Sequence, residues 1–203
     1  RDPGLVADCV AAMRGAVDLP VTVKCRIGVD EQNPEEVLPE FLARIVAAGC
    51  ERVTIHARKA WLKGLSPKEN RDIPPLDYDL VMRMKGLFPH LHISINGGVE
   101  TLAKAEELLE AGLDGVMIGR AAYHQPADIL GSADRRVFGT GPDRTAEDVV
   151  AQMLPYIEAH LTHGGRLHQI TRHMLGLFAG RPGARGWRRV LSEGATQPGA
   201  GPD

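Results

Sequence analysis

Two glycine-bearing turns carry the clearest chemistry in this sequence. Asn96-Gly97-Gly98 follows one run of strand-forming residues, and Gly119-Arg120 follows the next run. Glycines let a bare backbone approach a phosphate, and an arginine can add a charge-assisted hydrogen bond. Two such turns on consecutive strands favour a phosphate-binding site. The alternative is that Asn96-Gly97-Gly98 is an ordinary turn and that Gly119-Arg120 only marks the end of a strand.

Two further polar side chains alternate toward the same side of the predicted strands. Lys24 lies within VTVKCRI and His56 within RVTIHA, each flanked by apolar neighbours that face the other way. A lysine on an inner face needs an anionic or polar partner, because a bare ammonium is costly to desolvate. We therefore expect Lys24 and His56 to contact a phosphate-bearing cofactor. The alternative is a lysine paired with a carboxylate and a hydrogen-bonded core histidine.

Two basic regions suggest a polyanionic partner. Residues 159–192 contain six arginines and no acidic residue, whereas residues 1–158 carry 18 Lys and Arg against 24 Asp and Glu. The connection over residues 58–76 is long and combines Trp61 with the cations Lys59, Lys63, Lys68 and Arg71. This composition suits nucleic acid, which is held by phosphate contacts and by stacking. A solvated helix face and a solvated lid are the alternatives.

The cysteines and histidines show no spacing that is typical of a disulfide framework or a zinc site. Cys9, Cys25 and Cys50 are interpreted as packing residues of a protein from a reducing compartment, the cytoplasm. The eight histidines lack partners at metal-ligand spacing, so we predict no metal. No apolar run is long enough to span a bilayer, which argues against a membrane protein.

The elements that must position these residues alternate between strand and helix. The predicted strands cover residues 21–27, 52–57, 92–95 and 115–118. The predicted helices cover residues 6–17, 36–48, 77–88, 101–111 and 121–130, and then 167–178 and 185–191 after a capped helix that starts at Thr145. Strands that are separated by helices pair in parallel.

The distribution of polar residues decides between two parallel architectures. One face of each strand is apolar, while the other carries polar groups near the carboxyl end. This pattern is typical of a TIM barrel, whereas a doubly wound sheet is apolar on both faces. The predicted fold class is α/β: the last four strands of a TIM (β/α)₈ barrel over residues 1–140, then a small all-α helical domain over 141–194. Residues 195–203 are predicted to be a disordered tail.

Five stretches of the sequence resemble one enzyme family. They are VKCRIG (23–28), TIHARKAWLKGLSPKENRDIPPL (54–76), SINGGV (94–99), DGVMIGRAAY (114–123) and ITRHMLGLFAGRPGARGWRR (170–189). Together they resemble the tRNA-dihydrouridine synthases, and above all the A subfamily, over almost the whole chain. The resemblance implies an FMN-dependent TIM barrel with a helical tRNA-binding domain. Such enzymes use NADPH to reduce D-loop uridines of the 20/20a type in tRNA to 5,6-dihydrouridine.

The resemblance also implies roles for individual residues. Lys24 and His56 match positions that contact the flavin. The family's two phosphate loops match Asn96, Gly97 and Gly98 and then Gly119 and Arg120. Positions that grip tRNA in the A subfamily match Lys68, Arg71, Arg185 and Arg188.

One feature of the family is missing. Its general acid is a cysteine in an N-x-G-C-P motif, and these 203 residues contain no such motif. We expect the cysteine and the first four strands to lie upstream of residue 1, so this C-terminal part has no catalytic residue and is inactive alone. We expect the complete enzyme to be a monomer and the present chain to self-associate. The alternatives are another FMN-dependent TIM-barrel oxidoreductase and a non-catalytic RNA-binding fragment.

Overall fold

The structure is a computed structural model that describes residues 2–202. They form two compact units: the first runs up to Val99 and includes Lys104–Ile118, and the second comprises Glu100–Ala103 and the chain from Gly119 onwards. The division therefore falls near residue 118, whereas the sequence suggested a boundary at residue 140. Residue 1 of the predicted barrel segment and residue 203 of the predicted tail lie outside the described residues.

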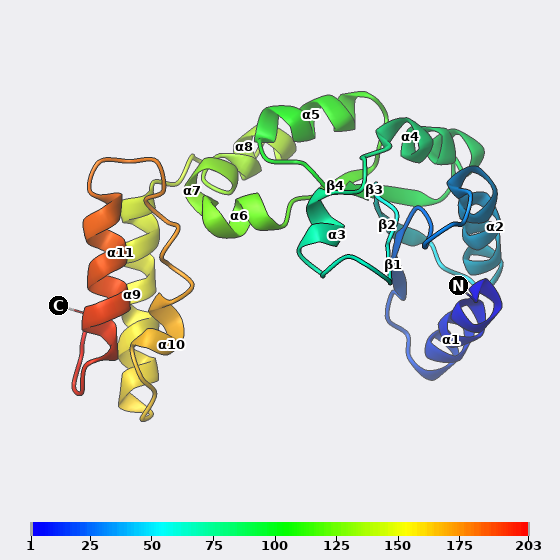
Figure 1. The fold of residues 1–203 in the computed structure, drawn as a ribbon. Helices are drawn as coiled ribbons and strands as arrows, with labels where there is room; N and C mark the ends of the chain where they lie inside the picture. The colour runs from blue at the N-terminus through cyan, green and yellow to red at the C-terminus, as the bar shows by residue number, and fades with distance from the viewer. Residues whose placement is uncertain (1, 203) are drawn as a thin grey trace. The chain divides into compact units, whose positions relative to one another are not determined.

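The first unit is built on a parallel sheet. Its strands are β1 (Thr22–Arg26), β2 (Arg52–His56), β3 (His92–Asn96) and β4 (Gly115–Met117). They lie in the order β1-β2-β3-β4, and every neighbouring pair is parallel (Figure 1). The predicted α/β class with a parallel sheet is confirmed, and each predicted strand is found within one or two residues of its expected bounds.

Helices cover the apolar face of this sheet. They are α1 (Pro3–Ala16), α2 (Pro34–Ala47), α4 (Tyr78–Leu87) and α5 (Leu102–Glu110). Asp2, Asn33 and Asp77 cap the first three helices by accepting a hydrogen bond from a backbone N–H of the first turn. The core between helices and sheet contains fully buried side chains from α2, β2, α4 and β3: Leu42, Ile45, Ile55, Leu80, Ile93 and Ile95. Among residues 2–202, no helix is long and apolar enough to cross a membrane.

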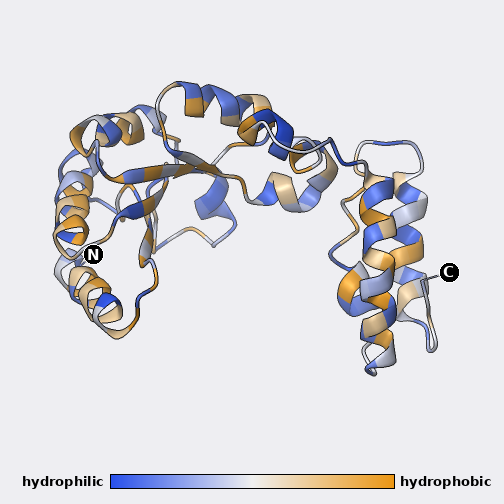
Figure 2. Ribbon diagram, turned by 180° about the vertical axis from the view of Figure 1, so that it is seen from behind, coloured by the Kyte–Doolittle hydropathy of each residue, from blue (hydrophilic) through white to orange (hydrophobic). Residues whose placement is uncertain are grey.

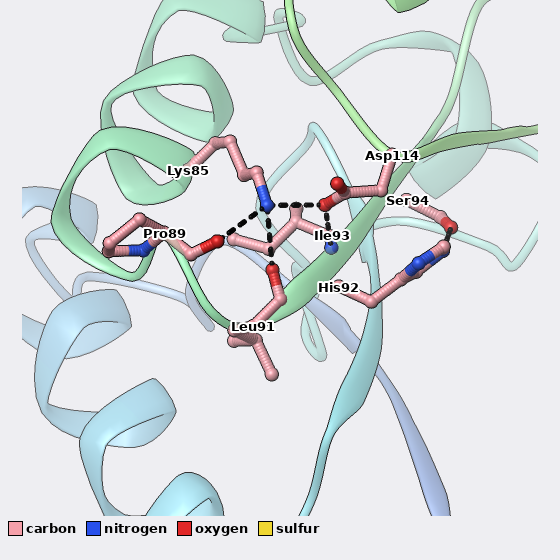
Figure 3. Close-up of polar contacts among 7 residues, drawn as sticks. All are labelled: Lys85, Pro89, Leu91, His92, Ile93, Ser94 and Asp114. Carbon is pink, nitrogen blue, oxygen red and sulfur yellow. Dashed lines mark hydrogen bonds and ion pairs between the residues drawn. The ribbon is translucent and has the colours of Figure 1, made fainter.

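An ion pair fastens α4 to the amino-terminal ends of β3 and β4. Lys85 Nζ lies 2.7 Å from Asp114 Oδ2 and donates to the carbonyl oxygens of Pro89 and Leu91 (Figure 3). The same Asp114 oxygen accepts from the N–H of Ile93 at 2.8 Å. Burial raises the pKa of Asp114, but the bonds from Lys85 and Ile93 outweigh it and hold the pKa below its usual value. The arrangement lies at the strand starts, away from the candidate site residues.

The chain after β4 differs from the sequence-based expectation. In place of one helix over 121–130, there are two short helices, α6 (Arg120–His124) and α7 (Pro126–Ile129). Pro126 explains the break, because it has no N–H to continue α6 and instead begins α7. A further helix, α8 (Ala133–Phe138), was not predicted.

The remaining helices are α9 (Ala146–Thr162), α10 (His168–Thr171) and α11 (Ala184–Glu193), followed by a 3₁₀ turn over Gly194–Thr196. The predicted cap is confirmed, because Thr145 and Asp148 form a reciprocal capping box. The helix predicted over 167–178 is limited to α10, after which the backbone makes successive i to i+3 turns up to residue 181. Figure 2 shows that hydrophilic and apolar residues are mixed along α9 and α11.

The tail predicted to be disordered over residues 195–203 packs locally at Ala195 and Ala200. Ala195 is buried, and Ala200 packs against the small apolar cluster that also contains Ile157 and Leu167. Glycine and proline content indicated disorder, but this local packing depends on α9 and on the residues around α10. Such packing between separated segments leaves no pattern in the tail sequence itself.

Candidate functional site

The polar face of the sheet carries two rows of neighbouring side chains. Because the parallel strands are in register, residues that pair across them point to the same face. Cys25 pairs with Ile55 and lies among the apolar side chains of the other face, so the predicted alternation is confirmed. From β1 to β3, the two rows of the polar face are Lys24, Thr54 and Ser94, and then, nearer the carboxyl ends, Arg26, His56 and Asn96.

His56 lies against the glycine turn that follows β3. Gly97 and Gly98 have φ of +106° and +68°, in the region that favours glycine. A Cβ on Gly97 would lie 3.2 Å from Nε2 of His56, and a Cβ on Gly98 would lie 2.5 Å from Cδ1 of Leu76. Backbone conformation therefore favours glycine at both positions, and the neighbouring side chains of His56 and Leu76 leave little room for a Cβ. The structure thus brings together two of the predicted features, His56 and Asn96-Gly97-Gly98.

Two side chains hold this turn in place from either side. The hydroxyl of Tyr78 in α4 donates a 2.6 Å hydrogen bond to the carbonyl of Gly97. The side-chain amide of Asn96 donates to the carbonyl of Met117 in β4 at 2.8 Å. Gly98 remains exposed, so the turn presents bare backbone to solvent beside a buried histidine. Exposed backbone, a buried imidazole and an amide side chain thus lie together at the carboxyl ends of β2 and β3.

Lys24 lies on the same face, one row nearer the strand starts. Its side chain is exposed, whereas the sequence suggested a buried lysine. Partial desolvation, followed by the nearby positive charge of Arg26, holds the pKa of Lys24 below its ordinary value. An anionic ligand on this face would relieve that repulsion, because it would stabilise the charged form of both side chains.

The second glycine turn belongs to the other unit. Gly119 precedes α6, and Arg120 is the first residue of that helix; both residues are exposed. A Cβ on Gly119 would meet no atom within 4 Å, so local space does not require a glycine here. Its exposure keeps the backbone accessible to a ligand.

The long connection after β2 is an ordered structure that contains α3 (Glu69–Asp72). The side chain of Asn70 accepts a hydrogen bond from the N–H of Trp61 and donates one to its carbonyl, each at 2.7 Å. Lys59 lies over the Trp61 ring, with Nζ 5.2 Å from the ring centroid. Lys68 and Arg71 are exposed on and beside α3. The loop therefore holds these cations on a defined surface.

Three arginines gather where this loop meets the sheet. Arg26 donates to the carbonyl oxygens of Lys59 and Asn70, both at 2.8 Å. Arg58 donates to the carbonyl of Pro74. Desolvation, then the charge of Arg58 and then that of Arg71, lower the pKa of Arg26. The structure thus places Arg71 near two cations that sequence reasoning did not select.

The basic residues of α11 lie on the exposed side of an amphipathic helix. Arg185 and Arg188 are exposed. Between them, Trp187 turns inward: its Nε1 donates to the carbonyl of Met174 at 2.9 Å, and its ring meets Phe178 edge to face at 4.9 Å between centroids. The tryptophan anchors the helix, and the two arginines stay on its solvent-exposed side.

The cysteines divide into two groups. Cys50 is buried, and Cys25 is largely shielded, with burial raising the pKa of its thiol to about 12. Cys9 is exposed on α1, so its interpretation as a packing residue is wrong; α1 presents this position to solvent rather than to the sheet. Within residues 2–202, no three His, Cys, Asp or Glu side chains gather in a way that could hold a metal ion.

The comparison with known families decides the identity. The sequence model of the dihydrouridine synthase family matches residues 1–202. The chain belongs to the dihydrouridine synthase family. Relatives named tRNA-dihydrouridine(20/20a) synthase include those of Shewanella oneidensis, 57% identical over 98% of this chain, and Vibrio cholerae, 55% identical over 98%. A third, from Escherichia coli, is 56% identical over 97% of the chain.

The chain spans about three fifths of the length of these relatives, 59%, 61% and 57% respectively. Among solved structures, a mandelate oxidase variant with benzoyl-formic acid has a TM-score of 0.43 and 15% identity, covering 90% of this chain and 64% of that one. A likeness at this level does not define the fold.

Sequence reasoning missed several residues that shape the site of this family member. Asn70 and Arg26 order the long loop, and Tyr78 holds the glycine turn. The inward parity of Arg26, two residues after Lys24, was a usable signal. Tyr78 gave none, because its partner is a backbone carbonyl 19 residues further along the chain. The partners of Asn70 are backbone atoms of its own loop, so they follow no regular helix or strand spacing.

Proposed function

We propose that the full-length protein, meaning this chain with whatever its gene encodes on either side, is a tRNA-dihydrouridine(20/20a) synthase of the A subfamily. It would use FMN and NADPH to reduce D-loop uridines of tRNA to 5,6-dihydrouridine, in the cytoplasm. One observation carries the proposal: within a member of this family, His56 and the Asn96-Gly97-Gly98 turn lie together at the carboxyl ends of parallel strands, with Lys24 on the same face one row earlier.

The order of the strands supports a barrel as the scaffold. Four parallel strands follow one another in the sheet without reversal, and helices cover one face only. A doubly wound sheet reverses its strand order at a switch point and is covered on both faces. We propose that the sheet forms the last four strands of a (β/α)₈ barrel, whose ligands bind at the carboxyl ends of the strands.

Each candidate residue has a definite task in this proposal. FMN, when bound, supplies the hydride chemistry that a protein side chain cannot. His56 orients the cofactor from its buried position beside Gly97, while Lys24 contributes positive charge on the same face. The bare backbone of Gly97 and Gly98 holds a phosphate oxygen, and Asn96 keeps that turn fixed to β4. Gly119 and Arg120 form the second phosphate contact.

None of the three cysteines of this chain is placed to protonate the reduced uracil ring. Cys25 is unsuitable, because burial holds its thiol protonated and its side chain faces the helices. The other two cysteines lie away from the polar face, in α1 and before β2. We therefore assign the general acid to the upstream cysteine of the family motif. The 203-residue chain by itself should leave tRNA unmodified.

Two groups of exposed cations are proposed to grip tRNA. Lys68 and Arg71 lie on the ordered loop, and Arg185 and Arg188 lie on α11. Arginine forks match phosphate oxygens, so these residues would fix the position of tRNA rather than read its bases.

Purified full-length protein tests the proposal directly. It should be yellow, release FMN on denaturation, and form dihydrouridine in tRNA from a strain that lacks the gene when NADPH is supplied. His56→Ala should lower bound FMN, whereas Cys9→Ser, an exposed change on α1, should not. A flavin-containing protein that leaves tRNA unchanged would favour another FMN-dependent oxidoreductase. A colourless protein that binds tRNA would favour the RNA-binding alternative.

A further inference from the structure

The second unit contains a contact that the proposed function does not use. Gly176, in the turns that follow α10, lies against the end of α6. A Cβ at position 176 would be 2.3 Å from the carbonyl oxygen of His124 and 2.8 Å from its carbonyl carbon. These are backbone atoms, which cannot move aside as a flexible side chain can. The φ of Gly176 is not in the left-handed region, so glycine is needed here for close approach alone.

A polar chain lies beside this backbone contact. Tyr123 Oη is 2.9 Å from His173 Nδ1, and the two rings meet edge to face at 6.0 Å. Arg172 Nε donates to His173 Nε2 at 3.0 Å. Since Nε2 accepts, the neutral imidazole carries its proton on Nδ1 and donates it to the tyrosine oxygen. The order Arg172, His173, Tyr123 therefore has one consistent set of donors and acceptors.

The far end of the same segment is also tied to the short helices. Nη2 of Arg181 lies 3.6 Å from Oδ1 of Asp128 in α7. We call residues 172–181 the docking segment. It contacts α6 near its first residues, through His173, and α7 at its last residue, through Arg181. The docking segment in turn holds α11, because the carbonyl of Met174 accepts from Trp187 and Phe178 packs on its ring. All of these residues belong to one compact unit.

The two helices joined in this way carry different proposed ligands. The first residue of α6 is Arg120, assigned above to the flavin phosphate, and α11 carries Arg185 and Arg188, assigned to tRNA. A reaction between two bound molecules requires that the protein elements that bind them keep a fixed geometry. A small displacement of one reactant relative to the other lowers the rate by a large factor. We propose that Tyr123, His173 and Gly176 are positioning residues that fix the tRNA-gripping helix α11 to α6. This inference rests on the proposed function.

Replacement of Gly176 by alanine gives the sharpest test, in the full-length protein with tRNA as substrate. The added methyl group must separate the docking segment from α6. The kcat for dihydrouridine formation should fall about tenfold or more. The KM for tRNA, the FMN content and the rate of flavin reduction by NADPH without tRNA should stay within about twofold, because the contacts that determine them are intact.

The matched control is Gly86→Ala in α4, where an added Cβ would meet no atom within 4 Å and φ is again ordinary. It should leave every parameter unchanged. Equal loss of kcat and flavin in Gly176→Ala would overturn the inference, because it would indicate general unfolding. An unchanged kcat would overturn it as well.

Two milder variants keep the inference testable if Gly176→Ala does not fold. Tyr123→Phe and His173→Phe both break the Tyr123 to His173 hydrogen bond and leave the backbone contact. Each should lower kcat two- to threefold, and the double variant should lose no more than either single one, since both remove the same bond. Losses that multiply would contradict the shared role.

Hydrogen exchange separates this inference from the proposed function. Amides of residues 172–178 should exchange faster in Gly176→Ala than in the parent protein, whether or not the protein is a synthase. Unchanged exchange would show that the docking segment is not held by this contact. A parent protein without flavin and without activity would instead remove the proposed function, and with it the positioning role.

Discussion

At the scale of single residues, the glycine turn after β3 restricts residue type through its backbone conformation. Gly98 has φ of +68°, a conformation that strains any residue with a Cβ, and a Cβ there would also displace the end of the Leu76 side chain. Gly98→Ala should therefore lower the free energy of unfolding by about 1–3 kcal/mol. It should also lower FMN content, because the turn would shift away from the proposed phosphate. Urea titration and extraction of flavin measure both effects, and Gly86→Ala is the control; retention of full FMN would contradict the assigned phosphate contact.

The three thiols should differ in reactivity for reasons of burial. With a pKa of about 12, only about one in ten thousand Cys25 side chains is ionised at pH 8. An alkylating reagent at that pH should label the exposed Cys9 quickly and label Cys25 and Cys50 only after unfolding. Mass spectrometry of timed samples measures the order. Rapid labelling of Cys25 in the folded protein would contradict its placement among the core side chains.

The same thiol gives stability a pH dependence. Because the folded-state pKa of Cys25 is raised, its contribution is fully present below the unfolded value of about 8.5 and is lost as pH rises toward 12. Cys25→Ser should reduce the decline of the free energy of unfolding between pH 8 and 10. Urea titration at several pH values measures this decline. Cys9→Ser should leave the slope unchanged.

At the scale of elements, the Lys85 to Asp114 pair joins α4 to the starts of two strands. Both side chains are partly buried, and the pair is supported by the N–H of Ile93. Lys85→Met should lower the free energy of unfolding by about 1–3 kcal/mol, since Asp114 would keep its charge without its main partner. Arg44→Ala, which removes an exposed ion pair within one helix, should cost at most about 0.5 kcal/mol.

The pair also determines how stability responds to acid. The pKa of Asp114 is lowered in the folded state, so its contribution is present above the unfolded pKa of about 3.9 and is lost as pH falls through the lower folded value. Lys85→Met should therefore weaken the decline of stability below pH 4. Chemical denaturation between pH 3 and 7 measures this, and an unchanged acid slope would contradict the role given to Lys85.

At the scale of the whole molecule, the arginines of α11 should act on tRNA and leave the flavin site unaffected. Replacing Arg185 and Arg188 together by alanine in the full-length protein should weaken tRNA binding. The slope of log affinity against log salt should fall by about one unit for each lost phosphate contact. FMN content should not change. Arg44 and Arg83, replaced together, remove the same charge from α2 and α4 and should leave the slope unaltered.

The sheet of this chain should also govern its behaviour in isolation. Among the described residues, β1 pairs only with β2 and β4 only with β3, so both edges present unpaired backbone groups. Open edges favour association. We expect the 203-residue chain alone to be oligomeric or aggregated by light scattering, while the full-length protein is a monomer. A cooperative, monomeric isolated chain would contradict this prediction.

Local patterns in the sequence were sufficient to predict most of the helices and strands, and to predict which side chains share a face of the sheet. Strand residues alternate with a period of two, so Lys24 and His56 could be placed opposite Cys25 and Ile55 before any coordinates were considered. The cap at Thr145 is likewise a local signal. Glycine turns, basic stretches and the family resemblance pointed to the same group of candidate residues.

Only the tertiary structure decided which of those residues meet. His56 lies against Gly97, and Gly176 lies against His124, and in both pairs the partners come from different segments of the chain. Some predictions differed from the structure because contacts between distant segments outweighed local preference. The helix predicted over 167–178 is short, and Ala195 is buried although its segment has the composition of a disordered tail. Local propensity is encoded residue by residue, whereas close approach between backbones depends on packing that forms only when the whole chain has folded.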